Sequence, residues 1–170
     1  MGFAIAAARI IHVVGGVIWV GSMFFVSTFL IPSLTEAGPD AGKVMAALNR
    51  RNFMIVIPVI ALLTILSGLW LYWRVSAGYD PAYMRSGPGQ AYGLGATMAI
   101  IAFIIGMTVT RPAMVKSGKL MASAATASPT EREAMMVQAQ AARARGARWG
   151  KVIVFLLIGA ATLMSLGRYL

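Results

Sequence analysis

Four uncharged apolar runs, each about as long as a lipid bilayer is thick, dominate this sequence of 170 residues. They cover residues 10–31, 53–73, 91–110 and 152–167. A helix rises about 1.5 Å per residue, so a run of roughly 20 residues crosses the hydrocarbon core. Only 12% of the residues are charged, about half of what soluble domains carry. The runs and the composition predict an all-α membrane protein, and they exclude soluble globular, collagen-like and disulfide-rich classes.

With their flanking residues, we predict a single membrane domain of residues 1–170 whose transmembrane helices cover residues 3–31, 53–73, 91–110 and 152–169. Four spans of this kind form a four-helix bundle. Each backbone polar group is then hydrogen-bonded inside its own helix, as the bilayer interior requires.

The segment 111–151 is rich in Ala, Met, Gln and Arg, which favour helix. Ser128, Pro129 and Glu131 fit a capping box with proline at the first helical position. We therefore expect a helix that begins at Pro129 and runs into the fourth span, with the third helix extending to about Ala122 beside it. The result is a helical hairpin between helices three and four.

The basic residues are distributed unequally between the two sides of the bundle. Eleven of the fifteen Lys and Arg residues lie in the segments between helices one and two and between helices three and four. The positive-inside rule therefore predicts a cytoplasmic hairpin and extracytoplasmic termini. Topology and anionic lipid headgroups already explain most of the net charge of +10, so nucleic acid is not an expected partner.

His12 is the only histidine, and it lies inside a predicted span. Ionisable side chains are costly in a membrane and tend to mark function. His12, Gly16 and Trp19 share one helix face, and the small residue next to the imidazole permits either a close helix crossing or the flat approach of a macrocycle. One interpretation is a tetrapyrrole such as haem b with His12 as axial ligand and Met98, Met164 or no residue as the second ligand. The other is a neutral histidine hydrogen-bonded across a helix interface.

The sequence lacks the residues that several kinds of membrane-protein function require. No Asp or Glu occurs in any span, which disfavours a carboxylate proton relay. The chain has no cysteine, and its spans lack the clustered soft ligands expected for copper transport. A Ser-His-Asp triad is not available at membrane depth.

The segment RIIHVVGGVIWVGSMFFVSTFLIPSL, followed by LNRRNFMIVIPVIALLTILSGLWLYW, resembles a superfamily of small four-helix bacterial membrane proteins. It includes the copper-resistance D-type proteins and the membrane-bound, oxygen-independent protoporphyrinogen oxidases. The resemblance covers roughly residues 8–74 and rests on His12, Trp19, Gly21, Arg50, Arg51, Pro58, Gly68 and Trp70. In the oxidase family the first-helix histidine is implicated in binding haem b, which implies that role for His12. With the charge asymmetry, the resemblance implies the bacterial inner membrane, with both termini on the periplasmic side.

More than one function is consistent with these residues. The absence of buried acids, of a second strong ligand and of a nucleophile favours a non-catalytic accessory or scaffold subunit of a larger energy-transducing membrane complex, contacting a tetrapyrrole through His12. The alternatives are a haem-binding redox protein or oxidase and a copper or small-molecule permease. For a subunit, we expect other membrane proteins to contact Arg143, Arg145 and Arg148 of the hairpin.

Overall fold

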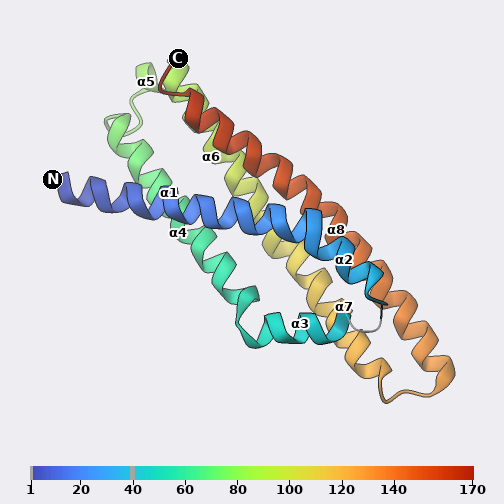
Figure 1. Cartoon of the computed structure of the whole chain (residues 1–170). Coiled ribbons are helices and arrows are strands. Elements are labelled where there is room, and N and C mark those ends of the chain that lie inside the picture. The colour runs from blue at the N-terminus through green and yellow to red at the C-terminus, as the bar shows by residue number, and fades with distance from the viewer. Residues whose placement is uncertain (1, 39–40) are drawn as a thin grey trace.

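The computed structural model describes residues 2–38 and 41–170, and this part of the chain is helical without strands (Figure 1). Within it, four helical rods are long and apolar enough to cross a membrane: Gly2–Glu36, Phe53–Val75, Gly87–Ala124 and Pro129–Leu166. The prediction of an all-α chain with four membrane-length helices is confirmed. Positions 1, 39 and 40 of the predicted single domain lie outside the described residues.

The first and third rods each contain a wide turn. The first consists of α1 (Gly2–Phe25), the π-helical turn η1 (Val26–Leu30) and α2 (Ile31–Glu36), and the third of α6 (Gly87–Ile105), the π-helical turn η3 (Gly106–Thr110) and α7 (Arg111–Ala124). Pro32 and Pro112 are each the second residue after one of these turns. Proline has no N–H, and its ring clashes with the carbonyl one turn earlier in a regular α-helix, so the wider turn lets the rod continue. Helix one therefore extends beyond its predicted end at residue 31.

The fourth rod is α8 (Pro129–Leu166), which begins where the sequence predicted. The backbone N–H and the hydroxyl of Ser128 both donate to Glu131 Oε2, at 3.2 and 2.6 Å. α8 ends three residues before the predicted boundary at residue 169, with Gly167 as its C-cap residue. α7 packs along the first half of α8, as expected for the two helices of a hairpin.

The second rod is α4 (Phe53–Val75), and the shorter helices α3 (Ala41–Arg50) and α5 (Pro81–Arg85) complete the described part of the chain. Asn52 separates α3 from α4 with φ 55°, a left-handed conformation that asparagine tolerates better than most residues. The short α5 was not predicted. The Asp80 carboxylate caps it by accepting the Tyr83 N–H at 3.1 Å.

The four membrane helices pack as two close pairs, α1 with α4 and α6 with α8, with fewer contacts between the pairs. A core joins them near the middle, made of Trp19, Ala61, Ala102, Ile153 and Leu157. Figure 1 shows both termini at the end of the bundle opposite the turn between α7 and α8. We call these the terminal end and the hairpin end.

Candidate functional site

A cavity of about 1130 Å³ lies between the two helix pairs and is lined by residues of α1, α4, α6 and α8. It extends from Trp19 and Leu157, which belong to the core, to arginines at the terminal end. Most of its wall is apolar, with residues such as Val20, Ile65 and Ile100. The cavity arises because the core holds the pairs together near their middle while few contacts join them elsewhere. Its volume suits an organic ligand of cofactor size.

His12 projects from α1 into this cavity, half-buried, and its ring is fixed by α4. Its Nδ1–H donates to the carbonyl oxygen of Thr64 at 2.8 Å. A carbonyl only accepts hydrogen bonds, so the proton is on Nδ1, and in the neutral ring Nε2 carries the lone pair. A backbone carbonyl on one imidazole nitrogen is the arrangement that prepares the other to ligate a metal.

Glycine residues make room for this ring. A Cβ atom placed on Gly68 would lie 2.5 Å from His12 Cε1 and 2.7 Å from Nδ1. A Cβ on Gly15 would collide with the Thr64 hydroxyl, which itself donates to the Ile60 carbonyl at 2.8 Å. Gly15 and Gly68 therefore let α1 and α4 approach closely enough for the hydrogen bond between His12 and Thr64.

Trp19 closes the inner end of the cavity. Its side chain is only 4% exposed and meets the ring of Phe103 edge to face, with centroids 6.4 Å apart. The sequence predicts a hydrogen-bond partner for its indole N–H inside the bundle. Within residues 2–38 and 41–170 the structure shows no such partner. Trp19 also forms part of the cavity wall.

The structure brings together most of the predicted cofactor-binding residues. His12, Gly16, Trp19 and Met164 all line the cavity. Met98 does not, since its side chain packs against Gly159 of α8. Met164 is therefore the better placed of the two sulfur atoms considered as a second ligand.

Three arginines at the terminal end of the cavity were not predicted as site residues. Arg9, Arg74 and Arg168 come from α1, α4 and the residues after α8. Across the described ranges, none of them forms an ion pair with a carboxylate. All three are exposed, and their presence around one cavity is a tertiary feature, because they are far apart in the sequence. The only signal the sequence offers is that each borders a membrane span.

Tyrosines occupy the same end of the molecule. Tyr92 lines the cavity and packs against Gly167, and the hydroxyl of Tyr72 donates to the Gly89 carbonyl at 2.9 Å. Burial, together with the neighbouring phenols of Tyr92 and Tyr72, raises the pKa of Tyr83 above its ordinary value of 10.0.

The three predicted partner-binding arginines of the hairpin differ in their surroundings. Arg145 and Arg148 are exposed, whereas Arg143 is half-buried. Nη2 of Arg143 is inaccessible and has no hydrogen-bond partner in the described part of the chain. Arg145 and Arg148 are therefore more accessible than Arg143.

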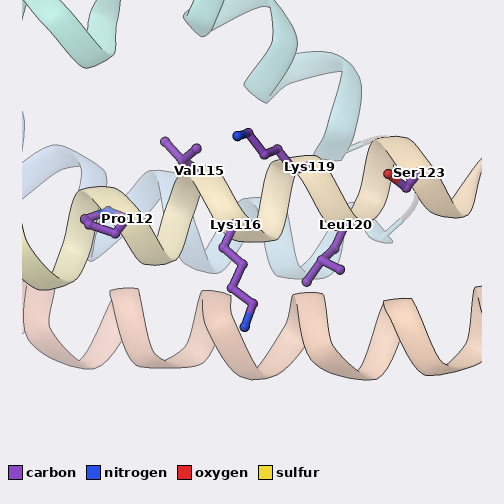
Figure 2. Close-up of a pocket in the computed structure, with 6 residues that line it drawn as sticks. All are labelled: Pro112, Val115, Lys116, Lys119, Leu120 and Ser123. Atoms are coloured by element: carbon purple, nitrogen blue, oxygen red, sulfur yellow. The ribbon is translucent and has the colours of Figure 1, made fainter.

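A second, shallower hollow of about 460 Å³ lies along α7 (Figure 2). All six residues that line it belong to this one helix: Pro112, Val115, Lys116, Lys119, Leu120 and Ser123. Figure 2 shows Lys116 and Leu120 directed toward α8 and Lys119 on the opposite side. A surface formed by one helix encloses no ligand, so this hollow does not compete with the cavity as a cofactor site.

No known protein family, curated protein or solved structure matches this chain. Among the described residues, no three His, Asp or Glu side chains lie close enough to hold a bare metal ion.

Proposed function

We propose that this protein binds a tetrapyrrole, most simply haem b, in the cavity between its helix pairs, with Nε2 of His12 as the axial ligand. The observation that carries this proposal is the hydrogen bond from His12 Nδ1 to the Thr64 carbonyl. It fixes the tautomer that leaves Nε2 free to ligate, on a ring that lines a cavity of about 1130 Å³.

The residues present fit such a group better than a bare metal ion. The chain has one histidine and no cysteine, so it offers too few ligands to hold a free transition metal. A tetrapyrrole itself supplies four nitrogen ligands to its metal, so the metal needs only one or two further ligands from the protein. When bound, haem would supply a redox-active iron whose potential depends on its axial ligands and on the surrounding dielectric.

Each site residue has a definite part in this proposal. His12 holds the metal, and Thr64 keeps its ring in one orientation. Gly16 and Trp19 form the apolar wall beside the macrocycle. Met164, which lines the cavity from α8, is the proposed second ligand, and a thioether there would raise the reduction potential relative to a second histidine.

The test is a reduced-minus-oxidised absorbance spectrum of the protein isolated gently from its membrane, followed by pigment extraction. We expect a tetrapyrrole band that is lost in His12→Ala. The matched control is Met98→Leu, which alters a methionine outside the cavity and should leave the band in place. A colourless wild-type protein that also fails to take up added haem would overturn the proposal.

The predicted role as an accessory subunit in the inner membrane remains a prediction alongside this one. The two are compatible, because a scaffold subunit can hold a tetrapyrrole for its complex. The oxidase and permease alternatives also remain predictions.

A further inference from the structure

We infer that Arg9, Arg74 and Arg168 bind the carboxylates of the tetrapyrrole and so set its orientation, acid edge toward the terminal end and apolar edge toward Trp19. This inference rests on the proposed function for the identity of the ligand. It adds a recognition site for a planar dicarboxylate, formed by residues that the sequence did not single out.

The first observation is the separation of charge and apolar surface along the cavity. The inner end is closed by core residues, with Trp19 at 4% and Leu157 at 2% exposure. The other end carries the three arginines, from three separate segments of the chain. A ligand that fills this cavity must be apolar over most of its body and anionic at one edge.

The second observation is that the arginines have no competing acid. In the described part of the chain none of the three is ion-paired, and the only acidic residue between α4 and α6 caps α5 instead. Arg168 lies 4.8 Å from the ring of Tyr169, a contact that leaves its guanidinium hydrogen-bond donors free. Guanidinium groups bind carboxylates through paired N–H donors, so they are suited to this task.

The third observation is the position of the arginines relative to His12. Arg9 precedes His12 by three residues on α1, about 4.5 Å along the helix axis. Arg74 follows Gly68, which contacts the His12 ring, by six residues or about 9 Å on α4. The cationic rim thus lies to one side of the ligating nitrogen, as expected if a planar ligand is held at its centre by His12 and at one edge by the arginines.

The experiment uses the full-length protein in phosphatidylcholine vesicles and measures the affinity for three probes. These are ferric protoporphyrin IX, metal-free protoporphyrin IX and the dimethyl ester of the metal-free porphyrin. We expect the metal-free diacid to bind more tightly than its diester. Arg9→Gln, Arg74→Gln and Arg168→Gln should each weaken diacid binding by about threefold to tenfold and leave diester binding unchanged. Arg85→Gln is the matched control, an arginine at the same end of the molecule that does not line the cavity.

The metal-free probe separates this inference from the proposed function. His12→Ala should abolish axial ligation of the ferric probe while the preference for diacid over diester is kept. If wild type binds the metal-free diacid and diester equally, the inference is overturned even where His12 ligates iron. The inference is also overturned if the arginine variants weaken binding of the diacid and of the diester alike. A third overturning result is that the variants no longer change diacid binding once the vesicles contain phosphatidylglycerol, because the arginines would then bind lipid headgroups.

Discussion

The imidazole of His12 packs against Gly68, so closely that a methyl group at position 68 would come within 2.5 Å of Cε1. Together with the 2.8 Å hydrogen bond to the Thr64 carbonyl, this contact gives the ring one position between α1 and α4. The orientation of the only histidine in the chain therefore depends on a glycine 56 positions away in the sequence.

Gly68→Ala should displace this imidazole without preventing the protein from folding. The added methyl group must push the ring away from Thr64, which removes the hydrogen bond and moves Nε2. We expect a shifted or weakened tetrapyrrole band and at least tenfold lower haem affinity, measured by titration. Gly118→Ala is the control, because a Cβ there meets nothing within 4 Å on a helix far from the cavity. Unchanged haem binding in Gly68→Ala would contradict the assigned role of His12.

Ile153→Ala should destabilise the bundle much more than Phe155→Ala on the same helix. Ile153 is 1% exposed in the core that joins both helix pairs, whereas Phe155 is 74% exposed and faces outward. Ile153→Ala should lower the free energy of unfolding by about 2–4 kcal/mol, and Phe155→Ala should lower it by less than about 1 kcal/mol. Unfolding in mixed micelles with increasing dodecyl sulfate measures both. Equal losses would indicate that the face of α8 bearing Phe155 is packed against another subunit.

Single cysteines test the predicted orientation directly, because the natural chain contains none. Ala125→Cys places a thiol in the turn between α7 and α8, and Ala82→Cys places one on α5, both at exposed positions. With eleven of fifteen basic residues on the hairpin side, we expect an impermeant maleimide to label only the α5 thiol in intact spheroplasts. Both should react in detergent. Labelling of the turn thiol from outside would reverse the orientation.

Charge reversal on the hairpin tests the predicted partner contact. Arg145→Glu with Arg148→Glu changes two exposed arginines, so folding should be preserved while a partner with an acidic surface is released. The measurement is recovery of the complex from native membranes at low and moderate salt. Arg143→Glu is expected to reduce stability instead, because that side chain is half-buried with an inaccessible nitrogen. Retention of the complex by the double variant would contradict docking through these arginines.

The four membrane helices can be predicted from local sequence, because apolar runs of bilayer length form helices in lipid. The start of α8 can be predicted in the same way, since Ser128 and Glu131 act on each other locally. The face shared by His12, Gly16 and Trp19 followed from helical periodicity alone.

The rest of the site depends on how the helices pack against one another. The hydrogen-bond partner of His12 is a backbone carbonyl, which cannot be predicted from residue type. Whether Met98 or Met164 lines the cavity depends on how α6 packs against α8. The convergence of Arg9, Arg74 and Arg168 depends on how the helix pairs are arranged around the core. These are long-range relationships, fixed by close packing between helices rather than by local sequence, and they decide where a ligand can bind.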